Sequence, residues 1–364
     1  MKNLQFILVF TFLFSQNILS QTGWFWQNPL PQGNILWDIC EDPNHPGRLF
    51  AVGDHGTILR KENIMDWQII EQGNFEHLYS VYFKGAYGWA VGYNGTILQN
   101  IDGIGNTWYP LNNSGTDKQL LSVFFFDQLN GWIVGQDQTI LHTSDGGSHW
   151  NSQSTSGSDH YFSVYFTSLL NGWIAGVANQ YGIIIKTTNG GTTWTNSLIP
   201  TSRMNSIKFI DENTGCVVGD EGRIYTTINA GVNWNLAVSN TTSDLQDFYM
   251  SSSGEGWAVG YDGTIIRTTN YGSNWNLESS PTTHTLYGIE GECSVGWAGI
   301  ILRRNINWEV ESEGFTNNLT GVDFADASNG WVVGWDGIVY HTTDGGNSWM
   351  QQNSGSTNDL LAVD

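Results

Sequence analysis

The 364-residue chain has few cysteines, which excludes a fold held together by many disulfides. Its three cysteines, Cys40, Cys216 and Cys293, are odd in number and widely spaced. We expect them to be small buried hydrophobic side chains, because free cysteine is among the most buried residue types. The eight histidines show no paired ligand spacing such as His-x-x-x-His, so we expect no metal and no cofactor.

Positive charge is also scarce. Thirteen basic residues face 34 acidic ones, and the formal net charge is −21. Nucleic acid and anionic membrane surfaces are therefore poor partners, because a phosphate backbone demands a cationic stripe. Charged residues make up only 13% of the chain, while glycine reaches 44 residues and tryptophan 18. This composition favours many short strands joined by tight turns over helical bundles or disorder.

Long apolar runs are absent except at the start, where residues 4–19 follow Met1-Lys2-Asn3 and precede Ser20-Gln21. This pattern predicts a signal peptide over residues 1–20 and a secreted, periplasmic or cell-surface location. The run contains Ser15, Gln16 and Asn17 and is a poor membrane span. No other segment approaches the ~18 to 20 apolar residues of a spanning helix, so we expect no integral membrane segment after signal removal.

The rest of the chain repeats one unit with a period of about forty residues, which is typical of propeller blades. Each unit has a first strand, a second strand that begins with Gly-Trp, a tight turn, a third strand, and a second reversal that ends in Trp. The turn dipeptides Asn94-Gly95, Asp262-Gly263 and Asp336-Gly337 accept positive φ angles without steric cost. The closing tryptophans are Trp67, Trp108, Trp150, Trp194, Trp234, Trp275, Trp308 and Trp349.

We therefore predict that residues 21–364 form a single all-β propeller of four-stranded antiparallel blades. Eight repeats favour eight blades; seven blades, or a fragment of a longer array, are the alternatives. In unit seven, Gly296-Trp297-Ala298 passes directly to Gly299-Ile300, so this unit lacks about four residues at its second turn relative to its neighbours and is the expected irregular blade. The units span 35–68, 78–110, 120–153, 161–197, 204–237, 245–278, 286–310 and 319–351, and a partial unit spans 358–364.

Five units carry a complete Thr-x-Asp/Asn-x-Gly-x-x-Trp box. The Asp or Asn oxygen can accept backbone N–H groups of its own turn, and the Trp can return into the hydrophobic layer between sheets. We predict a structural role for these side chains. They are Asp145 and Trp150, Asn189 and Trp194, Asn229 and Trp234, Asn270 and Trp275, and Asp344 and Trp349.

This box resembles the Asp-box of the bacterial neuraminidase (BNR) repeat. The whole unit, Gly-Trp-x-Val-Gly followed by Gly-Thr-Ile and the box, is similar to the photosystem II stability/assembly factor-like β-propeller family, in a secreted bacterial form. The resemblance covers nearly all of the mature chain and implies a non-enzymatic, monomeric interaction or assembly module. It also implies a basic patch, but Arg60, Lys186, Arg267 and Arg303 are isolated in a strongly acidic chain.

The rival hypothesis is an extracellular glycoside hydrolase of the sialidase or xyloglucanase type, or a glycan-binding module. A sialidase needs an arginine triad, and the Arg-Ile-Pro element typical of that family is absent. A glycanase needs two carboxylates across a cleft. The chain offers acids in excess on its second turns, where Asp-Gly also serves to make the turn. We therefore predict no catalytic residues.

We expect the face that carries the second turns to bind the partner, a protein or a glycan. Tyr93, Tyr261 and Trp335 occupy one turn position, and Asp54, Asp220, Asp262 and Asp336 recur beside them. A second equivalent set lies on the first strands and is predicted either to line a central channel or to pack between blades. Its members are Tyr82, Phe124, Tyr165, Lys208, Tyr249, Glu290 and Asp323.

Overall fold

The computed structural model describes residues 33–62, 67–70, 76–111, 114–155, 159–198, 200–312, 319–346 and 349–363. The predicted signal peptide, 1–20, lies outside these residues. The described residues form eight sheets of four antiparallel strands each, which confirms the predicted all-β class and the four-stranded repeat. No helix within the described ranges has the length and apolar character needed to cross a membrane.

The strands follow one another in sequence order within each sheet. Blade 1 contains β1 (Leu36–Glu41), β2 (Arg48–Gly53), β3 (Ile58–Glu62) and β4 (Gln68–Ile69). Blade 2 contains β5 (Leu78–Lys84), β6 (Tyr87–Gly92), β7 (Ile97–Asn100) and β8 (Trp108–Pro110). Blade 3 contains β9 (Leu120–Phe125), β10 (Gly131–Gly135), β11 (Ile140–Thr143) and β12 (Asn151–Ser152). Blade 4 contains β13 (Asp159–Phe166), β14 (Gly172–Ala178), β15 (Tyr181–Thr187) and β16 (Thr195–Leu198).

The remaining sheets repeat this order. Blade 5 contains β17 (Met204–Phe209), β18 (Gly215–Gly219), β19 (Ile224–Thr227) and β20 (Asn235–Leu236). Blade 6 contains β21 (Leu245–Met250), β22 (Gly256–Gly260), β23 (Ile265–Thr268) and β24 (Asn276–Leu277). Blade 7 contains β25 (Leu286–Glu290), β26 (Cys293–Gly296), β27 (Ile301–Arg304) and β28 (Trp308–Ser312). The eighth sheet contains β29 (Leu319–Phe324), β30 (Gly330–Gly334), β31 (Ile338–Thr342) and β32 (Met350–Asn353).

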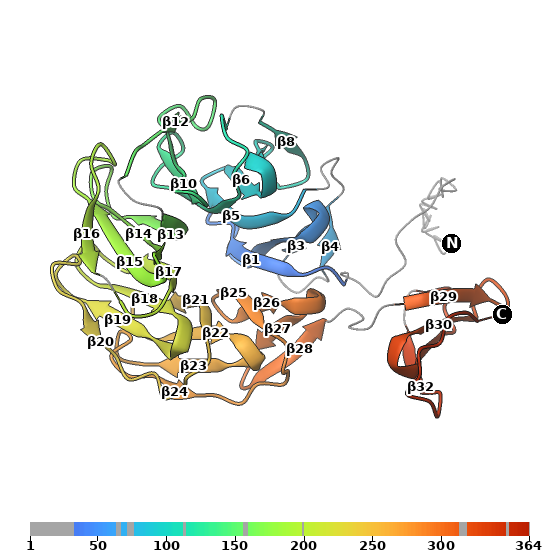
Figure 1. The fold of residues 1–364 in the computed structure, drawn as a ribbon. Coiled ribbons are helices and arrows are strands. Elements are labelled where there is room, and N and C mark those ends of the chain that lie inside the picture. Colours follow the sequence, from blue (N-terminus) through green and yellow to red (C-terminus); the bar gives the residue numbers. More distant parts are fainter. Residues whose placement is uncertain are drawn as a thin grey trace, which may run out of the picture.

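Eight sheets are present, but the ring closes after seven of them, which corresponds to the seven-blade alternative. β1 of blade 1 packs against β25 and β26 of blade 7, and the eighth sheet lies beside the closed ring (Figure 1). Val322 and Phe324 of the eighth sheet are 60% and 37% exposed, whereas their counterparts Val81 and Phe83 in blade 2 are 3% and 5% exposed. The apolar face of β29 therefore lacks the neighbouring blade that covers the same face elsewhere.

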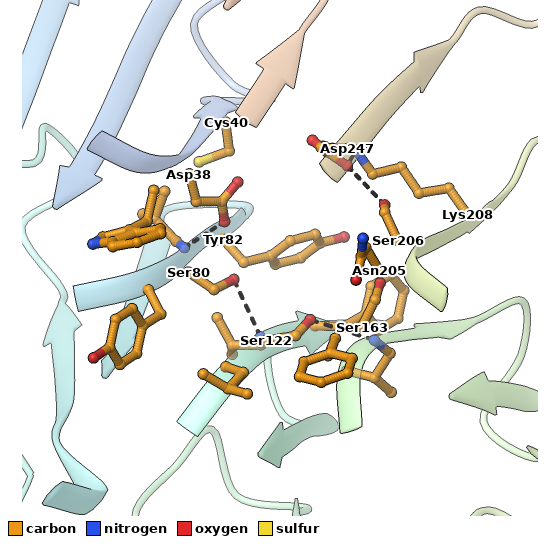
Figure 2. Close-up of a pocket in the computed structure, with 18 of the residues that line it drawn as sticks. Asp38, Cys40, Ser80, Tyr82, Ser122, Ser163, Asn205, Ser206, Lys208 and Asp247 are labelled. Carbon is orange, nitrogen blue, oxygen red and sulfur yellow. Dashed lines mark hydrogen bonds and ion pairs between the residues drawn. The ribbon is translucent and has the colours of Figure 1, made fainter. Parts of the chain in front are cut away.

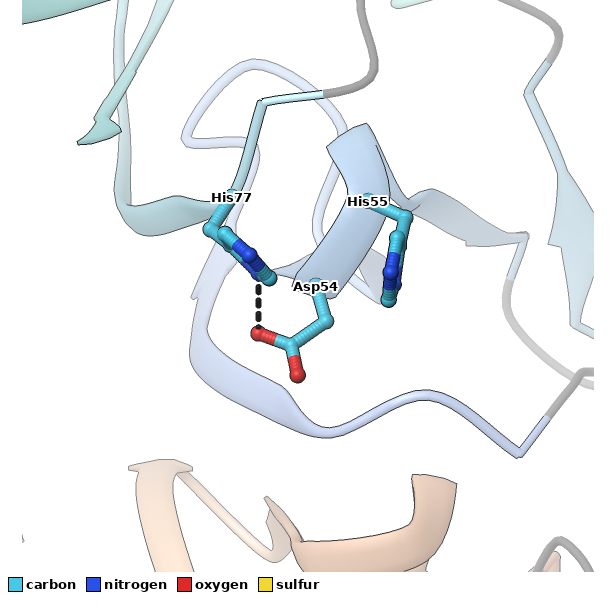
Figure 3. Close-up of side chains that lie close together, drawn as sticks. All are labelled: Asp54, His55 and His77. Carbon is cyan, nitrogen blue, oxygen red and sulfur yellow. Dashed lines mark hydrogen bonds and ion pairs between the residues drawn. The ribbon is translucent and has the colours of Figure 1, made fainter. Parts of the chain in front are cut away.

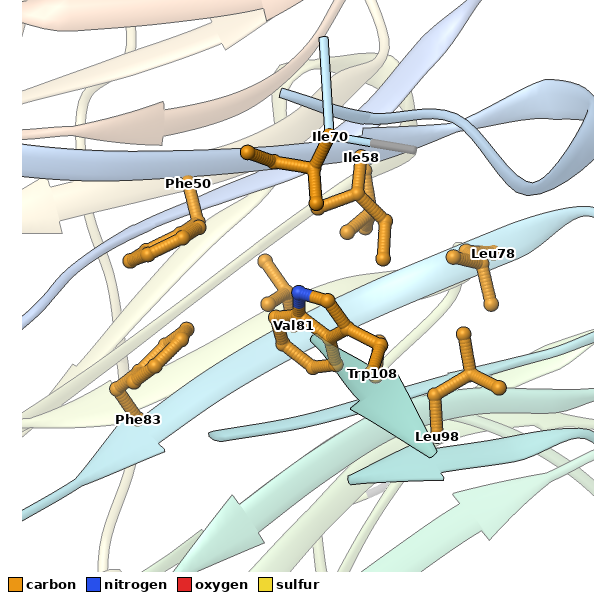
Figure 4. Packing of buried hydrophobic residues seen from close by; sticks show 10 residues of the cluster. Phe50, Ile58, Ile70, Leu78, Val81, Phe83, Leu98 and Trp108 are labelled. Carbon is orange, nitrogen blue, oxygen red and sulfur yellow. The ribbon is translucent and has the colours of Figure 1, made fainter. Parts of the chain in front are cut away.

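Aromatic pairs hold neighbouring blades together. The Gly-Trp tryptophan of one blade stacks on the phenylalanine that ends the first strand of the next, with ring centroids 3.5 Å apart for Trp89 and Phe125 and 3.6 Å apart for Trp132 and Phe166. Between blades 1 and 2 the stacked pair is Phe50 and Phe83, packed beside Trp108 (Figure 4). The second strands are almost uniformly apolar because they are covered on both faces.

The cysteines follow the same packing logic. All three are free; Cys216 and Cys293 are buried and Cys40 is partly buried. Cys216 takes the place of the Gly-Trp tryptophan in blade 5 and packs in a core cluster with Met250 of blade 6. The expectation that these residues serve as small hydrophobic side chains is therefore confirmed for the two buried ones.

Blade 7 corrects one detail of the sequence analysis. Its second strand is Cys293–Gly296, so Cys293 holds the tryptophan position, and Trp297 instead begins the turn that follows. That turn has its full length, and the deletion lies earlier, where only Gly291 and Glu292 separate β25 from β26. The dipeptide Gly296-Trp297 imitates the strand signal, which is why the sequence pattern was misassigned.

The Asp-boxes use their polar side chains within their own turns. In blade 3 the Thr143 hydroxyl donates to Asp145 Oδ1 (2.9 Å), which also accepts the His149 N–H (2.9 Å), while the Gly147 N–H donates to Thr143 Oγ1 (2.9 Å). A further hydrogen bond from the His149 ring lowers the pKa of Asp145 to about 2. The threonine hydroxyl donates in the same way to the box residue of four other units, namely Asn189, Asn229, Asn270 and Asp344.

Candidate functional site

The second turns of six sheets are short 3₁₀ turns. They are η1 (Asp54–Gly56), η2 (Tyr93–Gly95), η3 (Asp220–Gly222), η4 (Tyr261–Gly263), η5 (Trp297–Gly299) and η6 (Trp335–Gly337). The second residue of each has a positive φ, for example 55° at Asn94 and 54° at Asp262. In the five turns of the ring, the first residue donates its N–H to the residue that precedes the first strand of the same blade, as Tyr93 does to the carbonyl oxygen of His77 (2.8 Å). The second turns therefore lie beside the loops that enter the first strands.

The seven predicted binding residues fall into two groups. Tyr93, Tyr261, Trp335, Asp54 and Asp220 all occupy the first turn position, and Asp262 and Asp336 occupy the second, on left-handed backbone. The three aromatic side chains are 44%, 43% and 48% exposed, respectively. Trp335 belongs to the eighth sheet and is not brought together with the other two. Trp297, which the sequence analysis missed, holds the same position in blade 7 and is 46% exposed.

A cavity of about 720 Å³ lies on the axis of the ring (Figure 2). Residues of the first strands line it in three successive levels, because alternate residues of these strands face the axis and the bulged residue lies at the entrance. The entrance level consists of Trp37, Tyr79, Leu121, Phe162, Asn205, Gln246 and Tyr287. The middle level consists of Asp38, Ser80, Ser122, Ser163, Ser206 and Asp247, and the inner level of Cys40, Tyr82, Phe124, Tyr165, Lys208 and Glu290.

This arrangement answers the question left open for the first-strand set. Five of its members, Tyr82, Phe124, Tyr165, Lys208 and Glu290, line the central cavity. The aromatic members also contact their neighbours: Phe124 lies 5.1 Å from Tyr82 and 4.8 Å from Tyr165 between ring centroids. Tyr249 lines a smaller cavity of about 170 Å³, and Asp323 lies on the eighth sheet.

The middle level joins six of the seven blades to the next by a side-chain hydrogen bond; blade 7, which has Gly288 at this level, is the exception. Ser80, Ser122 and Ser163 each accept, through Oγ, the N–H of a residue in the following first strand, at 3.1 to 3.3 Å. Asp38 Oδ2 accepts the Val81 N–H (2.9 Å) in the same way, and Asp247 Oδ2 accepts the Ile289 N–H (3.1 Å). These short polar side chains therefore have structural partners and are not free to bind a ligand with those atoms.

Charge in the cavity is predominantly negative. Lys208 Nζ bonds to Asp247 Oδ1 (2.9 Å), and Arg203 lies 4.1 Å from the ring centroid of Phe162. Burial, reinforced by the charge of Asp247, raises the pKa of Asp38 to about 7, and burial also raises the pKa of Glu290 to about 7. Burial opposes the charge on Lys208, but Asp247 and Glu290 outweigh it, so the pKa of Lys208 is raised.

A row of aromatic side chains crosses the entrance from blade 2 to blade 7. We call Tyr93, Tyr79, Trp37 and Tyr287 the aromatic ridge. Trp37 lies 4.4 Å from Tyr287 and 5.8 Å from Tyr79 between ring centroids, and His77 lies between Tyr79 (6.5 Å) and Tyr93 (6.1 Å). Tyr261 extends the row, because the turn η4 that it begins packs against β25, which carries Tyr287. The sequence analysis missed Trp37, Tyr79 and Tyr287, although each directly follows the leucine that starts a first strand.

Asp54 ties the aromatic ridge to the second turns. Its Oδ1 accepts the indole N–H of Trp37 (2.7 Å) and lies 2.8 Å from Nδ1 of His77 in the next blade. Two arginines, Arg267 and Arg304, meet at Glu278 (3.6 and 3.7 Å), outside the central cavity. All seven arginines lie in the described part of the chain, and among them Arg203 alone lines the central cavity, whereas Arg48 bonds to Asp42 and Glu62. The arginine triad of a sialidase is therefore not assembled here.

Comparison with known proteins places this architecture in a family. A family model described as "Photosynthesis system II assembly factor YCF48" matches residues 107–286 and 301–362, which is more than half of the chain. The "Photosystem II assembly lipoprotein Ycf48" of Synechococcus sp. (strain CC9902) is 26% identical over 167 residues, 45% of this chain and 50% of that protein. The chain thus spans half the length of this curated relative.

Two solved structures are also similar. "YCF48 from Cyanidioschyzon merolae" is 19% identical, covers 88% of this chain and 98% of its own, and superimposes with a TM-score of 0.57. "YCF48 bound to D1 peptide" is 24% identical over 64% of this chain and 80% of that chain, with a TM-score of 0.46. The first of these supports the propeller fold. The extent of the family-model match, together with the repeated Gly-Trp strand and Asp-box, shows that the chain belongs to the photosystem II assembly factor Ycf48 family.

Proposed function

We propose that this chain is an exported, non-catalytic β-propeller that binds a protein partner through its turn-bearing face and helps that partner assemble. The single observation that carries the proposal is the aromatic ridge at the entrance of the central cavity. Its member Tyr93 and the neighbouring Tyr261 are exposed. Aromatic side chains are enriched among the residues that dominate protein interfaces, because they bury a large area at a small cost in conformational entropy.

The charge of the cavity favours a partner segment that carries lysine or arginine. Asp38, Glu41, Asp247 and Glu290 line the cavity, against Lys208 and Arg203. Complementary charge steers association and suppresses partners of the wrong sign. A basic side chain that enters past Trp37 would meet this acidic surface. The name of the Synechococcus relative gives that protein a role in photosystem II assembly. For this chain we propose the more general role of an assembly or interaction module.

The proposed location follows from the N-terminal pattern at residues 1–20, which lie outside the described residues. The name of the Synechococcus relative, a lipoprotein, is consistent with export in the family. Fractionation of cells that produce the full chain should place it outside the cytoplasm, and deletion of residues 1–20 should retain it inside. Recovery of the full chain in the cytoplasm alone would contradict export.

A glycan-directed function is the second candidate, and one observation favours it. Asp38 and Glu290 have pKa values raised to about 7 by burial, and a carboxyl that stays protonated near neutral pH is what a glycosidase requires of its general acid. Against it, both Asp38 oxygens accept backbone N–H groups, from Ile39 (2.8 Å) and Val81 (2.9 Å). Incubation with a panel of sialosides and glucans decides this point. Turnover that disappears in Glu290→Gln would overturn the non-catalytic proposal.

The partner-binding face is tested by replacing the exposed aromatic turn residues of the ring, with the exposed aromatic turn residue of the eighth sheet replaced as the control. One protein combines Tyr93→Ala, Tyr261→Ala and Trp297→Ala in the ring, and its matched control carries Trp335→Ala at the same turn position of the eighth sheet. With affinity beads at equal loading and native cell envelope as the source, we expect the ring variant to recover at least about tenfold less of the partner than the control. Equal recovery by both proteins would exclude the turn-bearing face of the ring.

A further inference from the structure

We infer that Asp54, His55 and His77 form a binding site for a divalent first-row transition metal ion, with Zn²⁺ as the expected occupant. One ligand atom from each residue lies within 4.8 Å of the others (Figure 3). Asp54 and His55 belong to the turn η1 of blade 1, and His77 lies in the loop that enters blade 2. The two histidines differ by 22 in residue number, so no local spacing in the sequence reveals this cluster.

The donor set matches the chemistry of such an ion. Two imidazoles and one carboxylate are common ligands for Zn²⁺, which accepts three protein ligands together with water. Calcium and magnesium prefer oxygen ligands alone, so a site with two imidazoles discriminates against them. His55 is exposed and the other two residues are partly buried, which leaves a path for the ion and positions for coordinated water.

The backbone already holds two of the ligands in place. Asp54 donates its N–H to the carbonyl oxygen of Ile35 (2.9 Å), and the Asp54 carbonyl oxygen accepts the Thr57 N–H (3.1 Å). Between these anchors His55 adopts the left-handed backbone conformation, at φ 54° and ψ 34°. This conformation sets the direction in which the His55 side chain leaves the turn. Non-glycine residues adopt this conformation rarely, and here the hydrogen bonds of the turn hold His55 in it.

The carboxylate of Asp54 is oriented by a neighbour. Trp37 donates its indole N–H to Oδ1 of Asp54 (2.7 Å), and Nδ1 of His77 lies 2.8 Å from the same oxygen. Both contacts use Oδ1, so Oδ2 can serve as the metal ligand while Trp37 keeps its bond. Hydrogen bonds of this kind fix metal-binding side chains and typically change affinity by 10- to 100-fold.

Only a small movement is required to close the site. Ligand atoms about 2.0 to 2.2 Å from a tetrahedral zinc ion lie about 3.3 Å from one another. The present separations, up to 4.8 Å, are reduced by rotation of the two imidazoles, whose ring centroids are 5.2 Å apart. His55, at the surface of the turn, can rotate without disturbing a blade interface.

The other His–carboxylate pairs in the described residues contain a single imidazole. His45 pairs with Asp42 (2.8 Å), His149 with Asp145 (2.7 Å) and His160 with Asp137 (3.8 Å). A single imidazole and one carboxylate bind a divalent ion less tightly than three ligands, because each additional preplaced ligand adds binding energy without further loss of translational freedom. These pairs therefore provide internal controls.

The experiment titrates the full chain, free of any affinity tag, with ZnCl₂ in a calorimeter. We expect one ion per chain. Each of His55→Asn, His77→Gln and Asp54→Asn should weaken binding at least about tenfold, and the double variant His55→Asn/His77→Gln should abolish it. The replacements are mild: asparagine occupies the equivalent of His55 in blade 2, as Asn94, and glutamine the equivalent of His77 in blade 3, as Gln119. CaCl₂ and MgCl₂ should give no binding.

The matched control is His149→Thr, which removes an exposed histidine from a single-imidazole pair and installs the residue found at Thr193 in the next box. It should bind Zn²⁺ as the unmodified chain does. A second measurement uses the thermal midpoint, which Zn²⁺ should raise in the unmodified chain and in His149→Thr but not in the double variant. Absence of Zn²⁺ binding to the folded chain, or unchanged binding in the double variant, would overturn the inference. Because the readout is the metal alone, it is independent of any partner.

Discussion

Gly288 in β25 lies directly against Asp38 in β1, and this contact closes the ring. A Cβ atom on Gly288 would lie 3.0 Å from Cα of Asp38 and 3.2 Å from the backbone N of Ile39. Four of the other blades have serine at this level, and its hydroxyl forms a hydrogen bond with the following blade in all four. Where blade 7 meets blade 1, Gly288 has no side chain to form this bond, and Asp38 Oδ1 instead accepts the N–H of its own neighbour Ile39 (2.8 Å).

This contact predicts a graded loss of stability at position 288. Gly288→Ala should lower the free energy of unfolding slightly and Gly288→Val by about 1 to 3 kcal/mol, because an added side chain forces the two first strands apart. Urea titration followed by tryptophan fluorescence measures both. If Gly288→Val unfolds at the same urea concentration as the unmodified chain, blades 1 and 7 are not packed as closely as the structure has them.

Comparison of two tryptophans, one buried and one exposed, distinguishes the structural role of tryptophan in this fold from its proposed role in binding. Trp132 is 1% exposed and stacks on Phe166 at 3.6 Å, whereas Trp297 is 46% exposed on the turn-bearing face. Trp132→Ala should destabilise the ring by about 3 to 5 kcal/mol through the cavity that it leaves. Trp297→Ala should change stability by less than about 0.5 kcal/mol. Equal losses in thermal unfolding would show that Trp297 also belongs to the packed layer.

Sequence reasoning predicted the strands, the turns and the four-stranded sheets, because each of these depends on local pattern. Alternation recurs in every unit and Gly-Trp in most of them, and a signal that is repeated in most units helps to assign a unit in which it is weak. Ring closure is different, because it depends on which two blades meet. Nothing in the sequence near Gly288 or Asp38 indicates that the two residues are in contact. A repeat count cannot distinguish a closing blade from an additional sheet such as β29–β32.

The candidate site was predicted only in part for a related reason. Tyr93 and Tyr261 were visible because they precede a turn dipeptide, and the turn-bearing face follows from strand order. Trp37 and Tyr287 lie 250 residues apart, yet their rings are 4.4 Å apart across the ring joint. Trp297 was hidden by its imitation of the strand signal, and His55 and His77 meet only because the turn of one blade touches the entry loop of the next.

Ionisation of Asp38 should make the free energy of unfolding depend on pH. Its pKa is raised in the folded chain to about 7, from 3.8, so the folded state binds a proton that the unfolded state releases. The stabilisation is complete below pH 3.8 and is lost as the pH rises through about 7. Asp38→Asn keeps an oxygen acceptor for one of the two neighbouring N–H groups but cannot ionise.

We therefore expect Asp38→Asn to gain stability relative to the unmodified chain between pH 4 and pH 8, as measured by urea titration at both values. The matched control is Asp145→Asn in an Asp-box, where asparagine is the residue in three sister units and where the pKa of the carboxyl is lowered rather than raised. The control should not show the same gain. A constant difference between Asp38→Asn and the unmodified chain at both pH values would exclude a raised pKa.

Lys208 and Asp247 are two of the departures from the repeat inside the cavity, and restoring the repeat at both positions tests whether they stabilise the ring as a pair. Lys208 takes a position held by tyrosine in three other blades, and Asp247 one held by serine in four, while their side chains bond at 2.9 Å. Lys208→Tyr alone leaves Asp247 and Glu290 without their cation and should cost about 1 to 3 kcal/mol, less than for a fully buried pair, because Lys208 is one-third exposed. Lys208→Tyr/Asp247→Ser returns both positions to the repeat and should recover most of that loss. A double-mutant cycle by urea unfolding measures the coupling between the two side chains. Additive effects would show that the Lys208–Asp247 interaction does not stabilise the ring.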